Sequence, residues 1–139
     1  MTQTNLTRPQ GLNRIDPVLR DSAIELGVVE FRTETLAAER KEADARAAER
    51  AAAVQTDGVA VDSRSIAGPD GQRLGIRLYR GGTGSRVPLV VYAHGGGFVT
   101  GNLDTDHAQC VELARAADCL VVSVDYRLAP ENPCPAALD

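Results

Sequence analysis

The stretch Leu89-Val90-Val91-Tyr92-Ala93-His94-Gly95-Gly96-Gly97-Phe98 decides the fold of this chain. Its first five residues form an apolar run that is too short for a stable helix, and three glycines soon end it. The pattern predicts a buried strand over residues 89–93 that stops in a glycine loop. Because glycine has no Cβ, backbone N–H groups in such a loop stay uncovered and can meet an anionic atom. We therefore look for chemistry in this loop first.

Two patterns fit these glycines. Gly95, Gly97 and Gly101 have the spacing G-x-G-x-x-x-G, and Asp125 ends the next apolar run, which loosely matches a dinucleotide-binding unit. Residues 94–97 instead match, letter for letter, the His-Gly-Gly-Gly loop that follows the third strand of α/β-hydrolase esterases. In those enzymes backbone N–H groups of the loop help to hold the tetrahedral oxyanion.

A second motif favours the esterase interpretation. Asp125-Tyr126-Arg127-Leu128-Ala129-Pro130-Glu131 directly follows an apolar run over residues 120–124. Together with residues 94–98 it resembles the hormone-sensitive-lipase-like family of α/β hydrolases, which comprises esterases and lipases carrying both motifs at about this separation. The resemblance covers residues 57–139 with specific motifs and residues 1–56 only loosely. It implies an α/β fold class, the N-terminal portion of an α/β-hydrolase fold.

The resemblance also implies roles for the glycine loop. Gly95, Gly96 and Gly97 are expected to form the oxyanion-hole loop, with Gly96 and Gly97 as the donors and Gly95 making the turn. In α/β hydrolases the catalytic base follows the nucleophile in chain order. We therefore expect His94 to support the loop and not to act as the base. His107 is excluded by the same argument and is expected to be exposed near a helix start.

Other residues of the two motifs are expected to line or support the site. Phe98 either forms a wall of the substrate pocket or packs in the core. Polar groups beside a buried strand need hydrogen-bonding partners. We interpret four of them as a structural network: Asp125, Tyr126, Arg127 and Glu131.

The residues that perform ester hydrolysis are missing from the chain. No G-x-S-x-G occurs, and no histidine follows residue 107. The serines all lack the flanking glycines of a nucleophile elbow: Ser22, Ser63, Ser65, Ser85 and Ser123. We expect the nucleophile, acid and base to lie beyond Asp139, and this chain alone to be inactive. The alternatives are a catalytically inactive hydrolase-like binding module and a nicotinamide-dinucleotide-binding unit.

The first part of the chain is predicted to be helical. Asp16 before Pro17 offers an N-cap for a short helix to about Leu26. An Ala-, Glu- and Arg-rich stretch predicts a second helix over residues 35–54. Both a lid over the active site and plain packing on the domain fit this helix.

We expect a domain boundary near residue 56, between a helical, cap-like segment and an incomplete hydrolase domain over residues 57–139. Residues 59–66 and 73–80 predict an antiparallel hairpin at the edge of the sheet, with a turn at residues 69–72. Residues 81–85 are rich in glycine but lack the features of a phosphate loop, so we assign them no chemistry.

A βαβ unit is predicted next. A helix capped by Asp104 or Thr105 is expected to connect the strand at 89–93 with a parallel strand at 120–124. If no further strand pairs with residues 89–93, that strand is an apolar edge, and the chain should bind hydrophobic dyes and aggregate.

Composition indicates a globular protein that acts on a small molecule. The 139 residues are 43% apolar, and the net charge of −4 gives no reason to expect nucleic acid as a partner. Cys110, Cys119 and Cys134 form neither a disulfide framework nor a zinc motif, which fits the cytoplasm. No run approaches the ~18 apolar residues of a spanning helix. We expect an acyl ester substrate, no cofactor and no metal, with the oligomeric state left open.

Overall fold

A computed structural model describes residues 14–26, 31–68 and 71–139, which form two compact units, Met1–Leu36 and Ala37–Asp139. In the first unit a 3-10 helix over Pro17–Leu19 leads into α1, Arg20–Leu26. The Asp16 carboxylate caps it by accepting a 2.9 Å hydrogen bond from the N–H of Val18, as predicted. Residues 1–13 lie outside the described residues, and the turn predicted at 69–72 lies partly outside them.

The second predicted helix is α2, Thr33–Ala52, close to the predicted bounds. Alanine, glutamate and arginine all favour helix, in agreement with its length of 20 residues. Among the helices that the structure describes, none is both long and apolar enough to cross a membrane.

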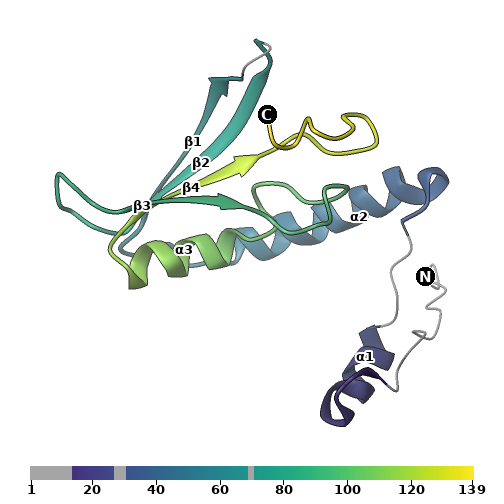
Figure 1. Ribbon diagram of the computed structural model, residues 1–139. Coiled ribbons are helices and arrows are strands. Elements are labelled where there is room, and N and C mark those ends of the chain that lie inside the picture. Colours follow the sequence, from purple (N-terminus) through teal and green to yellow (C-terminus); the bar gives the residue numbers. More distant parts are fainter. Residues whose placement is uncertain (1–13, 27–30, 69–70) are drawn as a thin grey trace. The chain divides into compact units, whose positions relative to one another are not determined.

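A four-stranded mixed sheet forms the body of the second unit (Figure 1). Its strands are β1, Ala60–Ala67, β2, Arg73–Arg80, β3, Leu89–Ala93, and β4, Leu120–Asp125. Their order is β1-β2-β4-β3, with β1 and β2 antiparallel, β2 and β4 antiparallel, and β3 and β4 parallel. The predicted hairpin and the predicted parallel βαβ unit are therefore both confirmed.

The core lies between the sheet and α3, His107–Ala116, which contacts β2 and β4. Tyr79, Val111 and Val121 are 0% exposed there. Burial alternates along β4, where Val121 and Ser123 are buried and the neighbouring Leu120, Val122 and Val124 are only partly so. The alternation follows from the period of two in a strand, and it shows that α3 covers one face.

The opposite face of β3 is open in the described chain. Leu89 is 62% exposed and Val91 is 69% exposed, whereas Val90 and Tyr92 pack against the core. The strand predicted as buried is therefore buried on one face only. In the sheet order β3 is one of the two edge strands, and among the described strands only β4 pairs with it.

The start of α3 differs from the prediction. Its N-cap residue is Asp106, one or two residues after the expected caps, and the helix begins at His107. Asp104 and Thr105 do not serve because their side chains bind other partners. The Asp104 carboxylate pairs with Arg77 at 2.7 Å, and the Thr105 hydroxyl accepts a 2.9 Å hydrogen bond from the N–H of Asn102.

Candidate active site

The glycine loop leaves β3 in backbone conformations that favour glycine. Gly96 has φ of +133° and Gly97 has φ of +60°. A Cβ at Gly96 would lie 2.0 Å from the carbonyl oxygen of Thr100, whereas a Cβ at Gly97 would meet nothing within 4 Å. Gly96 is therefore needed for close approach of the backbone, and Gly97 faces open space.

The three glycine N–H groups are not equivalent. Gly95 donates to the Asp106 carboxylate at 3.1 Å, and the hydroxyl of Tyr92 donates to the same oxygen at 3.3 Å. The N–H groups of Gly96 and Gly97 bind no acceptor within the described residues. Gly95 is thus tied down at the start of α3, while the next two amides stay available.

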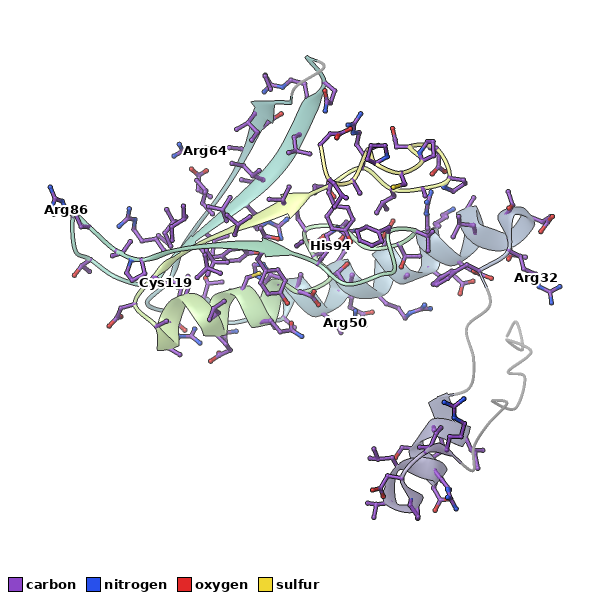
Figure 2. All side chains as sticks on the ribbon, viewed as in Figure 1. Arg32, Arg50, Arg64, Arg86, His94 and Cys119 are labelled. Carbon is purple, nitrogen blue, oxygen red and sulfur yellow. The ribbon has the colours of Figure 1, made fainter. Side chains whose placement is uncertain are left out.

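His94 lies beneath this loop (Figure 2), and it is only 4% exposed. Its Nδ1 is 2.8 Å from the carbonyl oxygen of Gly95, which only accepts, so Nδ1 carries the proton and donates. Nε2 has no partner among the described residues. The ring stacks on Tyr126 with centroids 4.2 Å apart. This geometry suits a supporting side chain.

Tyr126 links the two motifs. Its hydroxyl donates a 2.7 Å hydrogen bond to the carbonyl oxygen of His94, and its ring meets Phe98 edge-on at 6.0 Å. Phe98 is 56% exposed, so it is not packed in a core formed by the described chain. The main-chain oxygen of Phe98 accepts from the N–H of Ala129 at 2.9 Å, which holds the motifs side by side.

The other predicted network residues differ in their partners. Glu131 pairs with Arg40 of α2 at 2.7 Å, and this contact holds the pKa of the Glu131 carboxyl below its ordinary value. Arg127 donates from Nε to the carbonyl oxygen of Ala136 at 3.1 Å.

Asp125 stands apart from these contacts. Its carboxylate forms no hydrogen bond with any residue that the structure describes. Partial burial raises the pKa of Asp125, and His94 nearby opposes the rise. Asp125 is therefore a poor member of the proposed network.

His107, predicted to be exposed, is buried at 8% exposure. The hydroxyl of Tyr79 is 2.9 Å from its Nδ1, and Arg77 approaches the same nitrogen at 3.3 Å. Burial, with the charge of Arg77, lowers the pKa of His107, and burial raises the pKa of Tyr79 to about 12. The prediction failed because the helix begins at His107, which turns this side chain toward β2.

Several residues that contact the loop were missed in the sequence. Arg40 and Asp44 on α2 and Asp106 before α3 all hydrogen-bond to loop residues. Asp106 could have been predicted from the sequence, because it directly follows the expected helix caps Asp104 and Thr105. Arg40 and Asp44 had none, since charged residues occur throughout α2 and long-range partners leave no local pattern.

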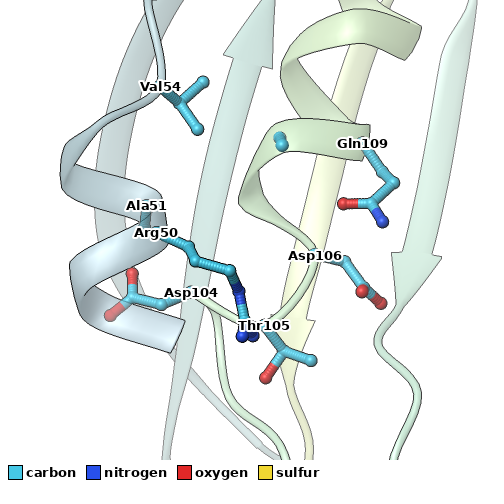
Figure 3. A pocket seen from close by; sticks show the side chains of 8 residues that line it. Arg50, Ala51, Val54, Asp104, Thr105, Asp106 and Gln109 are labelled. Carbon is cyan, nitrogen blue, oxygen red and sulfur yellow. The ribbon is translucent and has the colours of Figure 1, made fainter. Parts of the chain in front are cut away.

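A pocket of about 420 Å³ lies beside the site, between the end of α2 and the start of α3 (Figure 3). Its lining includes Arg50, Val54, Asp104, Thr105, Asp106 and Gln109. Its two carboxylates are already held, that of Asp104 by Arg77 and that of Asp106 by the N–H of Gly95.

Neither Ser123 nor a metal cluster adds other chemistry to the described part of the chain. Ser123 is 2% exposed within β4 and is not on a turn. Among the residues with described positions, no three His, Cys, Asp or Glu side chains gather as a metal site. All three cysteines are free, and burial raises the pKa of the Cys110 thiol to about 11.

Comparison with known proteins identifies the fold. The α/β hydrolase fold family matches residues 90–139. Carboxylic ester hydrolase LipN of Mycobacterium tuberculosis is 49% identical over 81 residues, covering 58% of this chain and 21% of that protein. Esterase LipI of the same species is 51% identical over 78 residues, covering 54% and 24% respectively. The chain thus spans about a fifth to a quarter of the curated relatives.

Solved structures agree along most of the chain. Esterase LipW from Mycobacterium marinum superposes with a TM-score of 0.78 at 47% identity, covering 96% of this chain and 42% of that one. A bacterial heroin esterase superposes with a TM-score of 0.73 at 32% identity, covering 91% and 40% respectively.

Proposed function

This chain belongs to the hormone-sensitive-lipase-like α/β hydrolases and corresponds to an N-terminal portion of their fold, and from this premise we propose that it supplies the oxyanion-hole loop of a serine carboxylic-ester hydrolase. The proposed substrate is a small, short-chain acyl ester. The proposed donors are the N–H groups of Gly96 and Gly97.

One observation carries the proposal. Gly95 uses its N–H on Asp106, while the N–H groups of Gly96 and Gly97 bind no acceptor in the described chain. When a nucleophile attacks an ester carbonyl, negative charge develops on the carbonyl oxygen. Donors already aimed at that oxygen stabilise the transition state more than the bound ester, because they need no reorganisation.

The supporting residues keep the loop in this state. His94 donates to the carbonyl oxygen of Gly95 and stacks on Tyr126, whose hydroxyl in turn holds the carbonyl oxygen of His94. Side-chain contacts of this kind fix a loop that three consecutive glycines would otherwise leave free to move. Phe98, exposed next to the glycines, is the proposed wall for the acyl group.

The chemistry requires groups that this chain does not provide. A serine nucleophile, a histidine that takes its proton and a carboxylate that orients the histidine are needed, and the second half of the oxyanion hole follows the serine. We propose that these groups lie outside the 139 residues. The chain alone is then inactive.

Two preparations test this proposal. The 139-residue chain should hydrolyse an activated acyl ester no faster than an unfolded-protein control. A joined enzyme, made by fusing this chain to the C-terminal part of the Mycobacterium marinum esterase, should hydrolyse the ester and be blocked by a serine-directed phosphonate. Turnover by the short chain that the phosphonate abolishes would overturn the assignment. A joined protein that folds but lacks turnover would favour a binding module.

A further inference from the structure

Arg40 on α2 reaches both motifs of the site at once. Its Nε donates to the carbonyl oxygen of Val99 at 2.6 Å, and its Nη1 donates to the Glu131 carboxylate at 2.7 Å. Its Nη2 donates to the carbonyl oxygen of Ala129. The side chain is 17% exposed. A single guanidinium therefore ties the end of the glycine loop to the segment that follows β4.

Asp44, one turn further along α2, makes a second contact with the loop. Its carboxylate accepts a 2.8 Å hydrogen bond from the side-chain amide of Asn102. The other side-chain atom of Asn102, its oxygen, accepts the N–H of Asp104 at 2.8 Å. Asp44 thereby orients the amide that shapes the turn leading to α3.

We propose that α2, through Arg40 and Asp44, is the positioning element that sets the conformation of the glycine loop, an inference that rests on the proposed function of the loop. Asp106 fixes the loop at Gly95, and α2 fixes it from Val99 to Asn102. Gly96 and Gly97 lie between these two anchors. Their N–H groups are held open because the backbone on both sides is fixed.

The geometry separates this role from plain helix packing. Arg46 on the same helix is 61% exposed, and within the described part of the chain it pairs only with Glu42, one turn earlier, at 3.5 Å. Such an exposed pair contributes little. Arg40 instead presents a planar fork whose several donors bind three acceptors, an arrangement that the single ammonium of lysine cannot reproduce.

Amide hydrogen exchange of the joined enzyme tests the proposal. The reporters are the N–H groups of Val99 and Thr100, which bind the carbonyl oxygen of Gly96, and that of Ala129, which binds Phe98. Exchange at these sites should accelerate roughly 10- to 100-fold in Arg40→Lys, because lysine cannot make all the hydrogen bonds that the charged guanidinium donates.

The matched control is Arg46→Lys, which keeps the same charge on the same helix and should leave every reporter unchanged. The core amides of Val111 and Val121 serve as internal references, because a general loss of stability accelerates them too. Equal loop exchange in Arg40→Lys and Arg46→Lys overturns the proposal. Equal acceleration of the loop and the core in Arg40→Lys also overturns it.

Asp44 provides an independent arm with a conservative rescue. Asp44→Asn keeps a side-chain oxygen for Asn102 and should leave the exchange of the Asp104 amide near its original rate, whereas Asp44→Ala should accelerate it. Equal rates in the two variants contradict the role of Asp44. These readouts need no catalysis, so they are independent of the proposed function, which Gly96→Ala in the joined enzyme tests separately.

Discussion

Two glycine-rich segments of this chain look alike in the sequence and differ in the structure. A Cβ on Gly81 would lie 1.9 Å from the carbonyl oxygen of Ala114, and one on Gly82 would lie 2.8 Å from that of Asp118. A Cβ on Gly97 would meet nothing within 4 Å. At residues 81–82 glycine allows the chain to pass close to the end of α3. In the loop at 95–97 it leaves backbone amides uncovered.

Glycine content alone therefore does not show what a glycine-rich segment does in the structure. Gly81 donates its N–H to the carbonyl oxygen of Cys119 at 3.1 Å, so its backbone is part of the packing. The N–H groups of Gly96 and Gly97 bind nothing in the described chain. For Gly81 and Gly97, the partner of the amide and not the residue type separates the packing position from the candidate binding position.

Gly96→Ala should give the largest effect. The added Cβ cannot fit 2.0 Å from the carbonyl oxygen of Thr100, so the backbone must shift and carry the adjacent N–H groups with it. In the joined enzyme we expect kcat to fall on the order of 10² to 10³-fold, about 3 to 4 kcal/mol, with KM little altered. Steady-state kinetics of folded protein measures this, and an unchanged kcat would show that the loop is structural.

Gly81→Ala should act on stability and not on catalysis. Placing a Cβ against the backbone of α3 is overpacking, which typically costs about 1 to 3 kcal/mol. Urea unfolding of the joined enzyme should show a lower midpoint, while kcat of the folded fraction stays the same. A fall in kcat as large as that of Gly96→Ala would erase the distinction between the two segments.

Gly97→Ala sharpens the contrast within the loop. With φ of +60° and no atom near the new Cβ, alanine is strained only by its backbone conformation, which costs about 1 to 2 kcal/mol. The N–H remains in place, so kcat should fall less than in Gly96→Ala. Parallel kinetics and unfolding of the two variants decide this. The reverse order would mean that Gly97 needs more freedom than its geometry indicates.

His107 should give the smallest effect, through pH. Burial lowers its folded pKa below the ordinary 6.5, so the unfolded chain binds the proton more readily. Stability is therefore complete above pH 6.5 and declines as pH falls from 6.5 toward the lowered pKa. Urea midpoints across this range should decline in the parent and decline less in His107→Gln. Equal slopes would show that His107 does not contribute.

The sequence predicted the elements well because their signals are local. Alternating apolar residues and turn glycines marked the strands, and the β3 bounds match the prediction. The start of α3 was misplaced because the carboxylate of Asp104 binds Arg77, which lies 27 positions away. Which partner such a side chain binds depends on contacts between distant parts of the chain, so a local sequence pattern cannot predict it.

The candidate site shows the same division. The glycines and His94 were predicted as site residues from a contiguous motif, since loop and support are neighbours in the sequence. Arg40 lies 59 residues before Val99, and it is one of several arginines in an ordinary helical stretch. Its isolation from solvent and its three acceptors are properties of the folded chain alone.

We propose that Gly96 and Gly97, and not Gly95, hold the oxyanion. Proton–nitrogen NMR of the joined enzyme, labelled at glycine and inhibited with a serine-directed phosphonate, tests it most directly, because a new hydrogen bond to a charged oxygen moves an amide proton downfield. We expect large downfield shifts of the amide-proton resonances of Gly96 and Gly97 and little change for that of Gly95, which Asp106 already holds. Unmoved Gly96 and Gly97 protons in the inhibited enzyme would contradict it.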